Sequence, residues 1–308
     1  MTEPTPPPTT FLLRAGHPIL PELRRILLEQ VDYALFQLTT PQLDEDRVVH
    51  EARKAFKRIR GVLRLVRDEI PAEDFARLNA LFRDAGRRLS DVRTSAVLDE
   101  TLQTLHQRYP RQLSDEDVAG VLARLRAHHE AMTQEVALGS ALFDQVAAEL
   151  RRGRKRMEEL PLTGNHFPGS GLRRVYARGR RGLRNSQRHG RVADFHEWRK
   201  RVKYLRYQVR ILSPAWPPVL TAVADELVVL SDLLGVDHDL AELHHTLVEH
   251  PELGLQGQEQ GKLLGLIERY RDELEAQSFQ HGRRLYVESP KDFTARIRAY
   301  WRIWSHEA

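Results

Sequence analysis

Two stretches of the sequence carry nearly the same row of cationic side chains, 146 residues apart. Each begins with a His-Glu pair, at His50 or His196, and each ends at an arginine, Arg64 or Arg210. The cationic positions that they share between these ends are Arg53 and Arg199, Lys54 and Lys200, Lys57 and Lys203, and Arg60 and Arg206. Arginine binds phosphate oxygens through a two-pronged guanidinium, and lysine binds them as a point charge. The repeated row therefore indicates binding to a polyanion.

The spacing of the first row places its cations on one face of a helix. With about 100° between successive residues, the opposite face collects apolar side chains such as Phe56 and Ile59. The cationic face contains His50, Arg53, Lys54, Lys57, Arg60 and Arg64, with Arg58 further round and Gly61 at the place where the second row has Tyr207. Like charges one turn apart destabilise a helix by about a few tenths of a kcal/mol per pair. A chain that carries this cost twice is expected to bind a ligand that removes it.

The charges of the whole chain are segregated rather than mixed. The net charge is only +5, yet residues 173–210 contain fourteen Lys or Arg and two acids, whereas residues 223–282 contain thirteen acids and three bases. Arginines also share one face of the helix expected before the second row: Arg173, Arg174, Arg180, Arg181 and Arg184. Such segregation indicates a strongly positive region and a polyanionic partner. The alternative is that the acidic helices neutralise the basic ones within the fold.

The remaining sequence predicts helices throughout, separated by prolines. The expected helices span residues 20–38, 44–69, 72–92, 94–108, 115–130, 133–159, 170–189, 192–212, 216–234, 237–249, 258–285 and 290–305. We expect a disordered tail at 1–10, a first helical unit at 11–160, a linker at 161–171 and a second helical unit at 172–308. Segments 89–98 and 234–243 are also similar, so the chain repeats internally. The repeat predicts an all-α fold of two bundles, related by a pseudo-two-fold axis around a central basic groove or pore.

Several classes of protein are disfavoured by what the sequence lacks. It has no cysteine, which excludes disulfides and thiolate metal sites. It also has no apolar run of about 18 residues, so we expect no membrane span and a cytoplasmic protein. Neither a P-loop nor a His-Glu-x-x-His zinc motif occurs, and we expect no cofactor, no metal and no catalysis. The acidic and histidine residues at 237–239 are expected to be solvated.

The two rows resemble the paired His-x-x-Arg…Lys/Arg…Leu-Arg motifs of the CHAD family, the conserved histidine α-helical domain. The resemblance extends over roughly residues 11–305. It implies two helical bundles whose basic helices line a shared positive pore or groove that binds inorganic polyphosphate. One departure is Arg93-Thr94, where the family has Arg-Asp. The second half keeps an Asp, in His238-Asp239. The Glu-x-Glu-x-Lys pattern of the triphosphate tunnel domains that accompany CHAD units does not occur in this sequence.

We therefore predict non-catalytic binding of inorganic polyphosphate, with other polyanions as further partners and polyphosphate granules as a location. Tyr207, on the cationic face of the second row, is expected to contribute to polyphosphate binding together with the residues already named. His50 and His196, with ordinary pKa values near 6.5, would become dual donors to phosphate, or would cap their helices. Two alternatives stay open. A nucleic-acid-binding protein would use the same charge, although only Tyr204 and Tyr207 could stack on bases. A polyphosphate or triphosphate hydrolase is the other.

Overall fold

The computed structural model describes residues 5–40, 43–89, 94–133 and 140–307 of the 308-residue chain. The described residues are mostly helical, and none of them lies in a β-strand, so the prediction of an all-helical chain is confirmed. The α-helices are α1 (Ile19–Thr39), α2 (Glu45–Leu65), α3 (Ala72–Arg88), α4 (Thr94–Arg108), α5 (Asp115–Thr133), α6 (Ser140–Glu158), α7 (Gly169–His189), α8 (Val192–Leu212), α9 (Pro217–Glu249), α10 (Gln258–Leu285) and α11 (Pro290–Glu307). Within the described ranges, no helix has both the length and the apolar character needed to cross a membrane.

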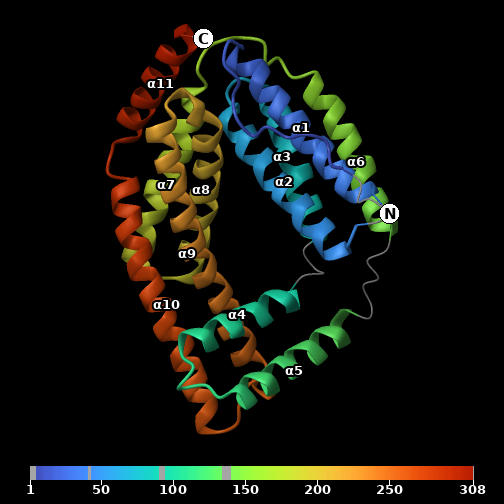
Figure 1. The fold of residues 1–308 in the computed structure, drawn as a ribbon, viewed down its shortest axis with the longest axis vertical. Helices are drawn as coiled ribbons and strands as arrows, with labels where there is room; N and C mark the ends of the chain where they lie inside the picture. The colour runs from blue at the N-terminus through green and yellow to red at the C-terminus, as the bar shows by residue number, and fades with distance from the viewer. Residues whose placement is uncertain (1–4, 41–42, 90–93, 134–139, 308) are drawn as a thin grey trace.

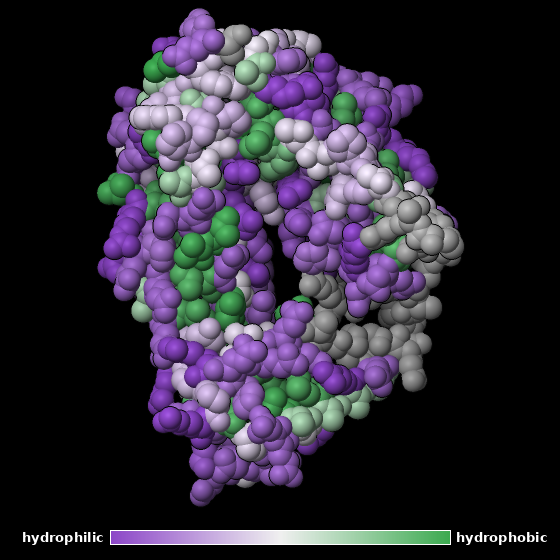
Figure 2. Space-filling view, in the orientation of Figure 1, coloured by the Kyte–Doolittle hydropathy of each residue, from purple (hydrophilic) through white to green (hydrophobic). Residues whose placement is uncertain are grey.

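The helices form two sides of the molecule and a connecting end (Figure 1). Helices α1, α2, α3 and α6 lie on one side, and α7 to α11 lie on the other. Helices α4 and α5 lie across the end farthest from the C-terminus, where α4 packs against α9, α10 and α5. The two sides meet where α2 packs against α8 and α7. Between them the space-filling view shows an opening, with hydrophilic residues along much of its edge (Figure 2).

Buried apolar side chains form two cores. The larger core extends across both sides and includes Phe56 of α2 and Trp198 of α8. The smaller core joins Leu105 of α4 to Leu243 of α9 and Ile267 of α10. The apolar faces of α4 and α5 therefore attach these helices to the second half of the chain. Burying apolar surface stabilises such an attachment by about 25 cal/mol per Å². Both cores therefore contain residues from each of the two units expected at 11–160 and 172–308.

Several helix boundaries differ from the sequence prediction. The sequence predicts a break after residue 234, but α9 continues through Gly235 to Glu249. A Cβ atom at Gly235 would lie 3.2 Å from Nη2 of Arg199, so this glycine leaves room for a neighbouring side chain without ending the helix. Helix α2 ends at Leu65 rather than at 69. A turn follows it before Pro71, and proline disfavours the helical conformation of the residue before it.

Helix α2 crosses α8 at a position where it has no side chain. A Cβ atom at Gly61 would lie 3.1 Å from both Cβ and Cδ2 of Tyr207. The neighbouring Gln208 donates a hydrogen bond from Nε2 to the carbonyl oxygen of Gly61, at 3.1 Å. This close approach brings the cationic faces of the two helices beside one another.

The N-terminal segment is attached to helices from both halves of the chain. Residues 5–10 adopt neither helix nor strand. The backbone N–H of Thr10 donates to Oε2 of Glu29 at 2.9 Å, and that of Leu13 donates to the carbonyl oxygen of Ile211 at 3.2 Å. Residues 1–4 of the tail that the sequence predicts to be disordered lie outside the described residues.

Candidate anion-binding site

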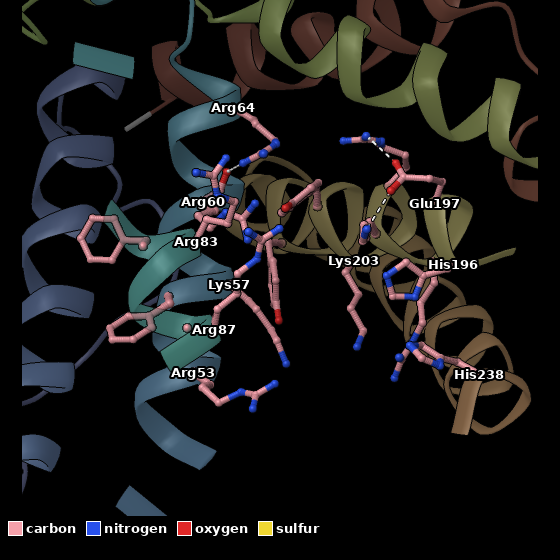
Figure 3. Close-up of a pocket in the computed structure, with 18 residues that line it drawn as sticks. Arg53, Lys57, Arg60, Arg64, Arg83, Arg87, His196, Glu197, Lys203 and His238 are labelled. Atoms are coloured by element: carbon pink, nitrogen blue, oxygen red, sulfur yellow. Dashed lines mark hydrogen bonds and ion pairs between the residues drawn. The ribbon is translucent and has the colours of Figure 1, made fainter. Parts of the chain in front are cut away.

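Helices α2 and α8 present cationic side chains to a shared cavity of about 550 Å³, named the central cavity here. Among the described residues that line it, ten are Lys or Arg and one, Glu197, is a carboxylate. The ten cations are Arg53, Lys57, Arg60 and Arg64 of α2, Arg83 and Arg87 of α3, and Arg199, Lys200, Arg201 and Lys203 of α8. Figure 3 shows labelled side chains of α2, α3, α8 and α9 around this space. Such a lining produces a strongly positive potential that attracts anions.

The apolar faces of α2 and α8 determine where these cations point. Phe56 and Ile59 of α2 are fully buried in the larger core, as are Val202 and Leu205 of α8. Asp44 precedes α2, and its side chain caps the first turn by accepting a hydrogen bond from the backbone N–H of Arg47. In each helix the apolar residues occupy one face and the cationic residues occupy the opposite face. When the apolar face is buried in the core, the cationic face points toward the cavity.

The first turn of each repeated row contains the same ion pair. In α2, Nζ of Lys54 lies 3.2 Å from Oε1 of Glu51. In α8, Nζ of Lys200 lies 2.7 Å from Oε1 of Glu197. Both pairs join residues three apart at matched positions of the two rows. Each of these two lysines therefore has a carboxylate partner on its own helix.

Arg64 lies at the junction of α2 and α8. Its guanidinium carbon is 4.0 Å from the centroid of the Tyr204 ring, which is a cation–π contact, and its Nη1 donates to the carbonyl oxygen of Arg60 at 2.7 Å. Burial, together with the nearby Arg60 and Arg201, lowers the pKa of Arg64 to about 10. Arg64 forms no ion pair with a carboxylate in the described part of the chain. Its positive charge is therefore only partly compensated.

Lys203 is half-buried, whereas its counterpart Lys57 is exposed. Burial, reinforced by Arg199 and Lys57, lowers the pKa of Lys203 to about 7, although Asp239 acts in the opposite direction. Burial also lowers the pKa of Arg199, whose Nε has no hydrogen-bond partner among the described residues. Nearby aspartates such as Asp239 offset part of this cost for both groups. Because buried charge is costly, an anion in the central cavity would stabilise both side chains further.

His196 is not charged at neutral pH. Its ring centroid lies 4.6 Å from that of His238 on α9, with the two rings nearly perpendicular at 79°. Burial, reinforced by Lys200 and His238, lowers the pKa of His196 to about 4. A neutral imidazole has one N–H donor, so at pH 7 it would give a phosphate one hydrogen bond. His50 is exposed, with its Nε2 3.7 Å from Oε1 of Glu51.

Two further cavities share walls with the central cavity. The first, of about 210 Å³, lies between the end of α2 and helices α3, α7 and α8, and we name it the arginine cavity. Its charged lining consists of Arg64, Arg67, Arg174, Arg178 and Arg201. The second, of about 730 Å³, is the mixed cavity, because it adds Glu100, Asp239 and Glu242 to cations shared with the central cavity. The arginine cavity therefore has a positive lining like that of the central cavity, whereas in the mixed cavity the three carboxylates offset the positive charge.

The structure brings about half of the sequence-predicted residues together. Those that line the central cavity are Arg53, Lys57, Arg60, Arg64, His196, Arg199, Lys200, Lys203 and Tyr207. Arg174 lines the arginine cavity. The others line none of the three cavities, and they are His50, Lys54, Arg58, Arg173, Arg180, Arg181, Arg184, Arg206 and Arg210. Arg58 instead lies over the Phe11 ring and donates to Gln30 of α1, because it is further round the helix.

Other lining residues were not singled out by the sequence. These are Arg67, Arg83, Arg87 and Arg201. Arg83 and Arg87 are four residues apart on α3 and share a carboxylate, Asp84, at 2.8 and 4.0 Å. The four-residue spacing of Arg83 and Arg87 is the signal that could have found two of them. Helical spacing alone does not say that these faces meet the repeated rows.

One expectation about the second half is wrong. The sequence predicts solvated positions at 237–239, but Asp237 is 2% exposed and pairs with Arg271, at 2.9 Å between Oδ1 and Nε. The reason is that α9 packs against α10 at this point and buries the carboxylate between them. The departure expected at Arg93-Thr94 lies outside what the structure describes of these side chains.

A family model for the CHAD domain matches residues 26–248. The chain belongs to the CHAD family. It is also similar to the crystal structure of the CHAD domain from the plant Ricinus communis, with a TM-score of 0.45 and 18% identity over 97% of this chain and 96% of that chain. No curated protein sequence matches this chain significantly. The matched CHAD segment includes both repeated rows, and with them the helices that line the central cavity.

Proposed function

We propose that this protein binds inorganic polyphosphate in the central cavity and does not hydrolyse it. The observation that carries the proposal is the ten Lys or Arg side chains, against one carboxylate, in a cavity between the two repeated rows. Polyphosphate carries about one negative charge per phosphate and offers only phosphate oxygens, which guanidinium and ammonium groups bind well. The association of the CHAD family with polyphosphate supports the same ligand.

The proposal includes two related bundles that share this basic groove. Gly61 and Tyr207 occupy matched positions of the two rows and contact one another, as equivalent residues near a two-fold axis do. The matched ion pairs of Lys54 and Lys200 support the same relation. With both rows on one cavity, a single chain of phosphates contacts both halves, and the contacts of the second half become intramolecular once the first is engaged.

The aromatic side chains at the cavity favour polyphosphate over nucleic acid. Proteins that bind single strands stack the bases on accessible aromatic rings. In this cavity Phe56 and Phe82 are 1% exposed and Tyr204 is 7% exposed, and Tyr207 packs against Gly61. These rings are therefore engaged in helix packing, and the accessible lining is cationic.

The absence of turnover is part of the proposal and has its own test. The carboxylate of the lining, Glu197, is held by Lys200 and Arg201, at 2.7 and 2.8 Å. Incubation of the protein with long-chain polyphosphate and Mg²⁺ or Mn²⁺ should release no more orthophosphate than buffer does. Steady release that scales with protein concentration would replace the binding proposal with a hydrolase.

Competition titration decides between polyanions. Labelled long-chain polyphosphate should be displaced by unlabelled polyphosphate far more effectively than by single-stranded DNA or RNA, at physiological salt and equal phosphate concentration. Equal displacement by all three would reject polyphosphate as the specific ligand.

In cells, we expect a fluorescent fusion to localise to polyphosphate granules in the cytoplasm and to lose this localisation in the Arg60→Gln/Arg64→Gln variant.

A further inference from the structure

The arginine cavity differs from the central cavity in size and in composition. It has about 210 Å³ against about 550 Å³, and its described charged lining is entirely arginine. At about 30 Å³ per water molecule, this space holds a phosphate group with a few waters rather than a length of chain. Phe75, Asn79 and Val175 complete its wall. A small space lined by several guanidinium groups suits one compact, highly charged anion.

The arginines of this cavity repel one another. Burial, reinforced by Arg201, Arg67 and Arg174, lowers the pKa of Arg178. Arg174 donates from Nη2 to both carboxylate oxygens of Asp68 at 2.9 Å, which leaves its Nη1 buried with no hydrogen-bond partner among the described residues. Of the five lining arginines, Arg174 and Arg201 form ion pairs, with Asp68 and Glu197. The cluster therefore keeps a net positive charge that an anion in the cavity would compensate.

The arginine cavity is joined to the central cavity by shared residues. Arg64 and Arg201 line both, and Arg201 is held in place by Glu197 at 2.8 Å. The two cavities therefore adjoin at these two guanidinium groups. A phosphate chain in the central cavity would reach the edge of the smaller space at this point.

We propose that the arginine cavity holds the terminal phosphate of a polyphosphate chain whose internal phosphates lie in the central cavity. This inference rests on the proposed function. An internal phosphate has one negative charge and two oxygens that are not bridging. A terminal phosphate resembles a phosphomonoester, with three such oxygens and close to two charges above a pKa of about 6. It therefore compensates more of the clustered positive charge in one small volume.

The test compares long polyphosphate chains with free ends and chains whose ends are blocked by esterification. Titrations at pH 7.5 use equal concentrations of chains of equal length. The free-ended chains should bind about tenfold more tightly, which is the expected effect of losing charge-assisted hydrogen bonds at one site. This difference should disappear below about pH 6, where the terminal phosphate takes up its second proton.

Arg178→Gln should bind both kinds of chain with the lower affinity of the blocked chain. Arg178 is exposed at the cavity edge, so the variant should keep its helicity and melting temperature. Arg184→Gln is the matched control, since Arg184 is exposed on the same helix and lines none of the three cavities. It should preserve the tenfold preference.

The outcomes separate this inference from the proposed function. Equal and tight binding of free-ended and blocked chains by the wild type would overturn the terminal site and leave polyphosphate binding intact. No binding of either chain would overturn both. Orthophosphate at millimolar concentration should remove only the extra affinity of the free-ended chain. Orthophosphate that binds while the two chains bind equally would mean a site for free phosphate, and would also overturn the inference.

Discussion

The two repeated rows have nearly the same cations but place them in different surroundings. Lys57 of α2 is exposed, whereas Lys203, its match on α8, is half-buried and has a pKa of about 7. Burial is the main cause of the lowered pKa of Lys203. Helix α9 packs along α8 and places Gly235 and Asp239 close to Arg199 of the second row. At this position of the repeat, the charge of the second row therefore depends on pH and on bound anion.

The ends of the two rows differ as well. Arg60 and Arg64 line the central cavity, but Arg206 and Arg210, their matches on α8, line none of the three cavities. Beyond Tyr207, the backbone of α8 is contacted by the N-terminal segment, through the hydrogen bond from Leu13 to Ile211. A sequence repeat therefore fixes the type of helix, while the neighbouring segments decide which part of it faces the cavity.

The largest effect is expected from removing two cations of the first row. Arg60→Gln/Arg64→Gln should weaken polyphosphate binding about 100-fold at physiological salt, because two charge-assisted contacts are lost. The slope of log affinity against log salt should also fall by about two, since fewer counterions are released. Titrations at several salt concentrations, beside circular dichroism to confirm folding, measure both effects.

The matched pair on the second row provides the control. Arg206→Gln/Arg210→Gln removes the same residue types from the same positions of the repeat, but outside the cavities. We expect a loss of about threefold or less, from long-range electrostatics alone. If both double variants lose affinity equally, the cations act through the overall charge of the protein and not through the central cavity.

The second prediction concerns the pH dependence that Lys203 should confer. Bound phosphate stabilises the ammonium form and raises the pKa of Lys203 above about 7, so binding is accompanied by proton uptake above that pH. Affinity should therefore fall as pH rises above 7, by up to about tenfold per pH unit. Arg199, Arg206 and Lys57 oppose protonation of Lys203 and Asp239 favours it, and none of the four has an ordinary pKa between 7 and 9.

Two substitutions separate this effect from a general one. Lys203→Arg keeps its charge throughout this range and should give an affinity that is nearly constant between pH 7 and 9. Lys200→Arg should retain the wild-type pH dependence, since Lys200 is exposed and paired with Glu197. Persistence of the fall in Lys203→Arg would show that another group is responsible.

Local patterns in the sequence predict the helices and the cationic rows, but not which segments meet. The periodicity around Phe56 and Ile59 identifies α2 because that face is buried. The place of Arg83 in the central cavity depends on how α3 packs against α2, and no local pattern contains that information. Gly235 suggests a helix end in sequence, whereas in the structure it makes room for Arg199. Residues whose roles depend on tertiary contacts are the ones that sequence reasoning misses or misplaces.

The smallest expected effect tests the crossing point of the two rows. Gly61→Ala places a Cβ atom 3.1 Å from Cβ of Tyr207, and overpacking of this kind costs about 1 kcal/mol or more. The melting temperature should fall by about 2–4 °C. Gly265→Ala, in α10, meets no atom within 4 Å and should leave stability unchanged or raise it, because alanine favours a helix.

The contact between Gly61 and Tyr207 also predicts how two substitutions combine. Tyr207→Ala alone loses aromatic packing, but it clears the space that a side chain at 61 would enter. The double variant Gly61→Ala/Tyr207→Ala should therefore be more stable than the sum of the single effects predicts, by about 0.5 kcal/mol or more. Thermal or urea unfolding of the four proteins measures this coupling. Strict additivity would mean that Tyr207 is not the reason for a glycine at position 61. It would also mean that the close crossing of α2 and α8 is not needed to bring their cations together.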